Sequence, residues 1–144
     1  ADSNSIVLNG SGIVDINAAV EATGGTVTAT ADSDDNAVAH DLQVGANVSG
    51  TTVTLQTGGT TNGSVVVDGS TLNSVGDTTF QSAASVELGA NVSTEGGVVT
   101  FEGTVNTVNL VGADRTVDTT NGGTAATGAN IDFTTTSIQG SWIR

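Results

Sequence analysis

The chain has 144 residues, of which 20 are glycine, 15 are acidic and two are basic, so its formal net charge is −13. A chain this acidic offers no basic surface to displace counterions from phosphates, which argues against a nucleic-acid partner. No apolar run approaches the roughly 18 residues of a transmembrane helix, so we expect no membrane insertion. The absence of cysteine excludes a disulfide framework and a thiolate metal site.

The length is typical of a single domain, here residues 1–144. The sequence opens with Ala1-Asp2 and lacks an initiator methionine, which fits a processed, exported chain or an internal fragment. For an exported chain, the expected location is extracellular or at the cell surface.

Taken in chain order, the predicted elements are strands rather than helices. Residues 5–8 and 12–16 are short apolar runs. The only stretch with moderate helix propensity, residues 15–23, is short and flanked by glycines, so a strand or turn is expected there. Further along, apolar and polar residues alternate with the period of a β-strand in residues 26–30, 52–56, 99–102, 104–110 and 131–134.

A six-residue motif recurs along the chain. VGANVS occupies residues 44–49, LGANVS residues 88–93, and a looser copy, TGANID, residues 127–132. Gly45 and Gly89 are 44 residues apart, which fits two units of about 22 residues. A unit of this length with short strands and Gly/Asn corners predicts an all-β fold, a parallel β-solenoid with coils of ~22 residues. The chain would then hold six or seven coils.

The repeat also predicts the conformation of the corner asparagines and the size of the side chains in the core. Asn at a repeated corner can adopt the left-handed conformation and can stack as a hydrogen-bonded ladder. Small residues and Val fit a narrow solenoid core, whereas bulky aromatic side chains do not. The chain has only four of these: Phe80, Phe101, Phe133 and Trp142.

An antiparallel β-sandwich is the alternative architecture, because sandwiches also show short strands at intervals of roughly 8–12 residues. In that fold, residues 5–8 and 12–16 would form edge strands, or a terminal strand exchanged with another chain.

Residues 85–92 followed by 96–101, and residues 114–123 followed by 128–133, combine strand-like stretches, turns rich in Gly, Thr or Asn, and Gly-Ala-Asn. This pattern resembles the repeat region of filamentous-haemagglutinin-like exported bacterial surface proteins. The resemblance implies a right-handed parallel β-solenoid, export to the cell surface and an adhesive or matrix role. It implies no catalytic residues.

Both ends of the chain are apolar, and an uncapped solenoid coil is a template for another chain. We therefore expect a homo-oligomer or filament that forms through the chain ends. The residues expected at this joint are Ile6, Val7, Leu8, Ile13, Val14, Ile16, Ile138, Trp142 and Ile143. The expected function is that of a non-enzymatic, self-assembling structural protein, a subunit or segment of a surface fibre or adhesin.

A monomeric calcium- or glycan-binding adhesion module is the alternative function, with a host or matrix glycan as partner. Asp32, Asp34, Asp35 and Asp41 form the densest group of oxygen ligands, the type that Ca²⁺ prefers, although the EF-hand pattern is absent. No other cofactor is expected. The single histidine, His40, and the lack of a Gly-x-Ser-x-Gly motif argue against an enzyme.

Overall fold

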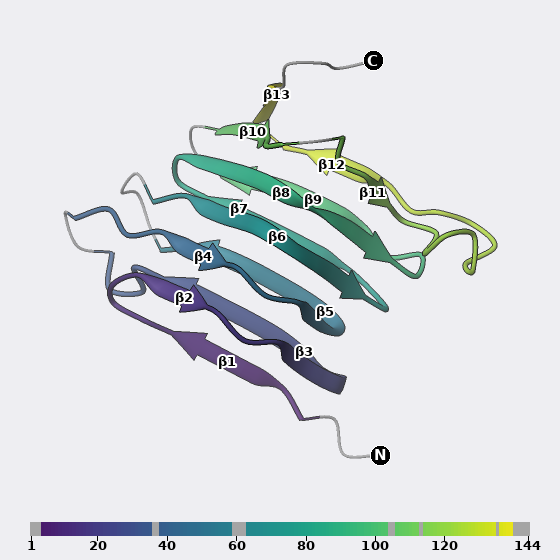
Figure 1. Ribbon diagram of the computed structural model, residues 1–144, viewed down its shortest axis with the longest axis horizontal. Coiled ribbons are helices and arrows are strands. Elements are labelled where there is room, and N and C mark those ends of the chain that lie inside the picture. The colour runs from purple at the N-terminus through teal and green to yellow at the C-terminus, as the bar shows by residue number, and fades with distance from the viewer. Residues whose placement is uncertain are drawn as a thin grey trace.

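The protein is a parallel β-solenoid, as its repeat predicts. The computed structural model describes residues 4–35, 38–58, 63–103, 106–112, 114–134 and 136–139, and none of these is helical. The coils stack along one axis, which places the first strands and the last strands at opposite ends (Figure 1). Every pairing between named strands is parallel, and one isolated antiparallel bridge joins Glu95 to Thr120. The alternative prediction of an antiparallel sandwich is wrong, because each strand pairs with the strand one coil further on and not with a reversed neighbour.

Strands account for most of the described residues. They are β1 (Ile6–Asn9), β2 (Val14–Ile16), β3 (Val20–Ala31), β4 (Leu42–Val44), β5 (Val48–Thr57), β6 (Val65–Ser74), β7 (Thr78–Ser82), β8 (Ser85–Thr94), β9 (Val99–Gly103), β10 (Asn106–Leu110), β11 (Val117–Asp118), β12 (Ile131–Phe133) and β13 (Thr136–Gln139).

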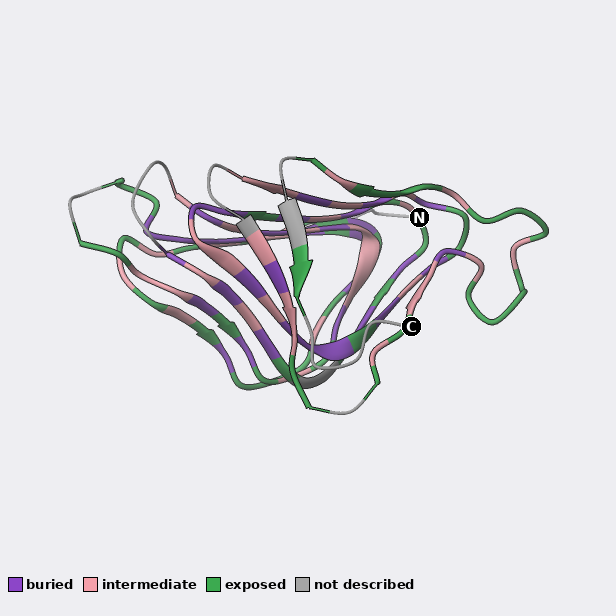
Figure 2. Cartoon of the chain, turned by 90° about the horizontal axis from the view of Figure 1, so that it is seen from above, coloured by how far each residue is buried: buried purple, intermediate pink, exposed green. Residues whose placement is uncertain are grey.

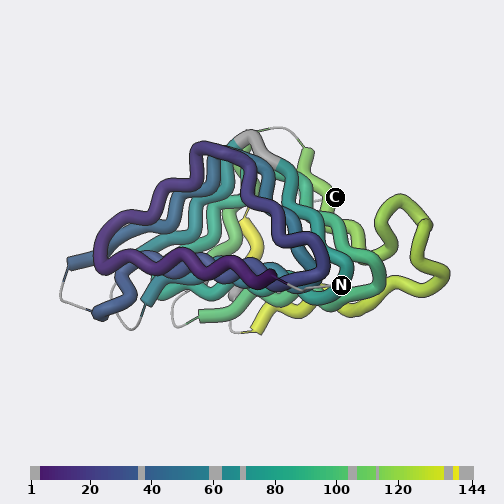
Figure 3. The backbone as a smooth tube through the Cα atoms, turned by 90° about the horizontal axis from the view of Figure 1, so that it is seen from below, coloured from purple at the N-terminus to yellow at the C-terminus, as the bar shows by residue number. Residues whose placement is uncertain are grey.

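Each coil has three sides, which give the solenoid a roughly triangular outline (Figure 3). The long strands β3, β5, β6 and β8 turn a corner and so contribute to two sides. Face 1 consists of β1, β7, β9, β12 and the second halves of β3 and β5. Face 2 consists of β2, β4, β10, β13 and the first halves of β6 and β8. Face 3 consists of the first halves of β3 and β5, the second halves of β6 and β8, and β11.

The coils vary in length around an average of about 24 residues. On face 1, Ile6 pairs with Val27, Val27 with Val53, Val53 with Thr78 and Thr78 with Val99, which gives coils of 21, 26, 25 and 21 residues. The next partner, Ile131, comes 32 residues after Val99, because residues 119–130 form a loop that projects from the body (Figure 3). The solenoid therefore has about four regular turns, and the expectation of six or seven is wrong.

The two close copies of the motif occupy the same corner, between faces 2 and 3. Val44 and Leu88 both pair with Val67, and Val48 and Val92 both pair with Leu72, so the copies lie two coils apart. The spacing of 44 residues predicted this relationship. The looser copy lies at a different corner, since it leads into β12 on face 1.

The core is a column of inward-facing side chains that stack in register from coil to coil. Figure 2 shows the buried positions on each side of the coils. Val and Leu dominate it because alternate residues of each strand point to the axis and β-branched side chains fit a pleated sheet. The fully enclosed members include Val27, Leu42, Val48, Val53, Leu55, Val65, Leu72, Leu88 and Val99, each 0% exposed.

Aromatic rings also enter the core, contrary to the expectation from composition. Phe80 and Phe101 are both 0% exposed, and Phe133 lies over them half-buried. Neighbouring ring centroids are 4.8 and 4.9 Å apart with 4° between the planes. These distances match the spacing between parallel strands of about 4.8 Å, so three in-register rings fill one side of the core without a gap.

Candidate functional site

The asparagines of the repeat have a structural role. The side-chain oxygen of Asn47 accepts a hydrogen bond from the backbone N–H of Thr71 (3.1 Å), and that of Asn91 accepts one from the N–H of Thr116 (3.0 Å). Each bond joins one coil to the next at the corner between faces 2 and 3. These asparagines do not have a left-handed backbone, and they lie two coils apart, so neither expectation for the corner holds. They provide acceptors for corner N–H groups that the strand ladder leaves unpaired.

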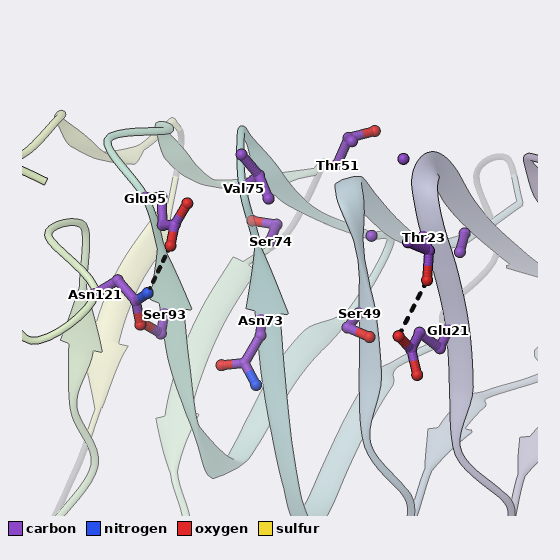
Figure 4. Close-up of a pocket in the computed structure, with 13 residues that line it drawn as sticks. Glu21, Thr23, Ser49, Thr51, Asn73, Ser74, Val75, Ser93, Glu95 and Asn121 are labelled. Carbon is purple, nitrogen blue, oxygen red and sulfur yellow. Dashed lines mark hydrogen bonds between the residues drawn. The ribbon is translucent and has the colours of Figure 1, made fainter. Parts of the chain in front are cut away.

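Face 3 carries a groove of about 410 Å³ that crosses the coils and is lined mainly by residues with polar side chains. Its floor is built from the repeated pattern of an inward apolar residue followed by an outward polar one. The outward residues Glu21, Ser49, Asn73 and Ser93 are successive register partners on β3, β5, β6 and β8. Figure 4 shows these side chains in a row, with Asn121 at the end next to Ser93.

The two ends of the groove are held by hydrogen bonds between side chains. At one end, the Thr23 hydroxyl donates to Oε1 of Glu21 (3.1 Å). At the other, Nδ2 of Asn121 donates to Oε1 of Glu95 (2.9 Å), and the Ser93 hydroxyl donates to Oδ1 of Asn121 (3.2 Å). The two carboxylates are thus restrained in position (Figure 4).

The centre of the groove is different. Within the described part of the chain, the side chains of Ser49 and Asn73 have no hydrogen-bond partner. Asn73 is exposed, and Val75 beside it is 57% exposed. The groove therefore presents free hydroxyl and amide groups and an apolar side chain between two fixed carboxylates.

Asp118 continues the outward column of face 3 as the register partner of Ser93. Its carboxylate accepts hydrogen bonds from the Thr120 hydroxyl (2.7 Å), the Thr120 N–H (2.7 Å) and the Gly122 N–H (2.6 Å). These bonds, with the Thr120 hydroxyl first, lower the pKa of Asp118 below its ordinary value. The carboxylate organises the turn that carries Asn121 to the groove.

A second hollow, of about 800 Å³, lies at the N-terminal end of the solenoid. It is lined by β1, β2 and the start of β3, and includes Leu8, Ile13, Val14 and Ile16. Among the described residues, β1 pairs only with β3 and β2 only with β4, so both strands present a free edge at this end.

Most of the residues predicted at the joint lie at the two ends of the stack. Ile6, Leu8 and Val14 are partly buried against the core, Ile16 is buried, and Val7 and Ile13 are each 60% exposed. Ile138, 40% exposed, belongs to β13 at the opposite end. Trp142 and Ile143 lie outside the described residues.

The predicted calcium ligands do not form a cluster. Asp32 is fully buried, with Oδ1 3.4 Å from Nδ1 of His40, whereas Asp34 and Asp35 are exposed. Oδ1 of Asp41 accepts a hydrogen bond from the Ser64 N–H (2.8 Å). Among the residues that the structure describes, no three His, Cys, Asp or Glu side chains are placed to hold a metal ion. Calcium binding therefore stays a prediction.

Sequence reasoning missed the groove. Its signal is the recurrence of Val20-Glu21-Ala22, Val48-Ser49-Gly50, Leu72-Asn73-Ser74 and Val92-Ser93-Thr94. These triplets are 28, 24 and 20 residues apart, so they align only once the length of each coil is known.

None of the described residues forms a helix long and apolar enough to span a membrane. Comparisons with protein-family models, with curated proteins and with solved structures find no match for the chain. The likeness to filamentous-haemagglutinin-like repeats accordingly stays a resemblance, and the function is argued from the geometry of the fold.

Proposed function

We propose that the chain is a non-enzymatic structural element of an extracellular surface fibre or adhesin, a subunit or segment whose end coil stacks on a further coil. One observation carries the stacking part of the proposal, namely that no other described residue covers the outer side of the first coil. The free edges of β1 and β2 and the apolar hollow beside them lie together at one end. Unpaired strand edges are templates for parallel pairing, and the apolar lining adds a hydrophobic contribution.

The partner of this end is another coil of the same kind. A second copy arriving with its C-terminal end, where Ile131 and Ile138 are each 40% exposed, would continue faces 1 and 2. Such a head-to-tail contact generates a filament when the rotation does not close. Because each copy carries a net charge of −13, association should strengthen as salt screens the repulsion.

The test compares two variants with the same change in charge. Ile13 lines the hollow and is 60% exposed, whereas Val38 is 61% exposed and does not line the hollow. Ile13→Glu should abolish assembly in negative-stain electron microscopy and sedimentation, whereas Val38→Glu should assemble like the wild type. A wild-type chain that stays a monodisperse monomer at high concentration and ~0.15 M salt would refute self-assembly through this end.

A second candidate function, a monomeric glycan-binding adhesion module, is supported by the groove on face 3. The other form of this alternative is a calcium-binding adhesion module. It would be supported if calcium raised the melting temperature of the wild type and Asp34→Ala removed this rise. No effect of calcium on the wild type would end that interpretation.

A further inference from the structure

We propose that the groove on face 3 binds a neutral, N-acetylated oligosaccharide that lies along the solenoid axis. The inference rests on the second candidate function and is independent of assembly through the ends.

The shape of the groove favours a linear ligand. Its polar side chains come from successive coils in register, so they recur at the strand spacing, and Glu21 and Ser93 lie three spacings apart, about 14 Å. A ligand placed along this row meets one polar side chain on each coil. A chain of similar units, each with hydroxyl groups, matches such a row better than a compact small molecule.

The chemistry of the centre favours a sugar with amide substituents. The Ser49 hydroxyl and the Asn73 amide can each donate and accept hydrogen bonds, as can sugar hydroxyls and acetamido groups. Both side chains are without partners among the described residues, so binding breaks no hydrogen bond within the protein. Val75, 57% exposed, offers an apolar contact for an acetamido methyl group.

The charges define what the groove rejects. Glu21 and Glu95 can accept hydrogen bonds from sugar hydroxyls, and their links to Thr23 and Asn121 hold them in place before binding. The same carboxylates, with the net charge of −13, repel sulfated and uronate-containing glycans. A basic peptide would complement the two carboxylates, but it would leave the neutral centre at Ser49 and Asn73 without a charged counterpart.

The experiment is a titration of the chain by isothermal calorimetry, with the state of assembly of each sample recorded by light scattering. The probes are N-acetylchitotetraose, cellotetraose, a heparin tetrasaccharide and tetralysine. We expect saturable binding of N-acetylchitotetraose, weaker binding of cellotetraose and no binding of the heparin fragment. Asn73→Ala should weaken binding of N-acetylchitotetraose roughly 3- to 10-fold, the loss expected for one or two hydrogen bonds.

The matched control is Asn109→Ala, which removes an outward-facing Asn from β10 on face 2 and should leave binding unchanged. Circular dichroism verifies that both variants keep the wild-type fold. Equal binding of cellotetraose and N-acetylchitotetraose would overturn the assignment of an N-acetylated ligand while leaving a glycan-binding module. Binding of tetralysine alone, or of none of the three glycans, would overturn both the inference and that candidate function. Binding of the heparin fragment alone would overturn the inference only. None of these results bears on assembly.

Discussion

The stacked phenylalanines should make the largest side-chain contribution to stability at the C-terminal half of the solenoid. Phe101 is 0% exposed and lies between two parallel rings at 4.8 and 4.9 Å. Phe101→Ala creates a cavity on the scale of a whole ring, which costs about 3–5 kcal/mol. Phe101→Leu keeps much of the volume but loses both ring pairs, each worth about 0.5–1.5 kcal/mol, so roughly 1–3 kcal/mol is expected. Phe133→Ala should cost about half as much as Phe101→Ala, because Phe133 is half-buried and has a ring on one side only.

Urea unfolding followed by circular dichroism measures these differences. The control is Thr100→Ala, a half-exposed neighbour on the same strand that should stay within about 0.5 kcal/mol of the wild type. If Phe101→Ala lowers both the urea midpoint and the dependence of the unfolding free energy on urea concentration, the last coils unfold separately from the rest. A solenoid allows this because each coil contacts only its neighbours. The reasoning is refuted if Phe101→Ala costs no more than Phe133→Ala, or no more than the Thr100 control.

Three further predictions concern the corners of the coils. Asn91→Ala leaves the Thr116 N–H without its acceptor and should cost about 0.5–1.5 kcal/mol in urea unfolding, whereas Asn91→Asp, which keeps an acceptor oxygen, should cost less. Gly97→Ala places a Cβ on the backbone of Gly76 in the preceding coil and should destabilise the protein by about 1–3 kcal/mol. The control Gly12→Ala, where the nearest atom is 3.9 Å away, should be nearly neutral. Equal melting temperatures of the two variants would contradict the close contact at Gly97. Because the folded-state pKa of Asp118 is lowered, its stabilisation of the turn is present above the pKa of the unfolded chain and is lost as pH falls through the folded-state value. In NMR spectra, the Thr120 and Gly122 amide resonances should therefore shift together as the pH is lowered, and Asp118→Asn should abolish these shifts. Resonances that do not move in the wild type would contradict the hydrogen bonds from these amides to Asp118.

The sequence by itself determined that the chain is all-β, because that information is local, and its repeat favoured the solenoid. Alternation of Val or Leu with Thr, Ser or Asn specifies strands with one inward side, and the two close copies of Gly-Ala-Asn mark one corner. The 44 residues between Gly45 and Gly89 indicated two coils, and the structure places both motifs at the same corner. The resemblance to surface-fibre repeats rests on the same local patterns.

Only the tertiary structure decided which side chains meet. Coil length varies from 20 to 32 residues, so sequence spacing alone cannot align Glu21, Ser49, Asn73 and Ser93 into one column. Asn121 contacts Glu95, 26 residues earlier in the chain, because β11 pairs with β8 and the turn held by Asp118 directly follows β11. The same holds for the core, where composition argued against aromatic rings but Phe80 and Phe101 stack in register. Contacts in a solenoid form across coils, and the register that creates them is set by how many residues each corner takes up.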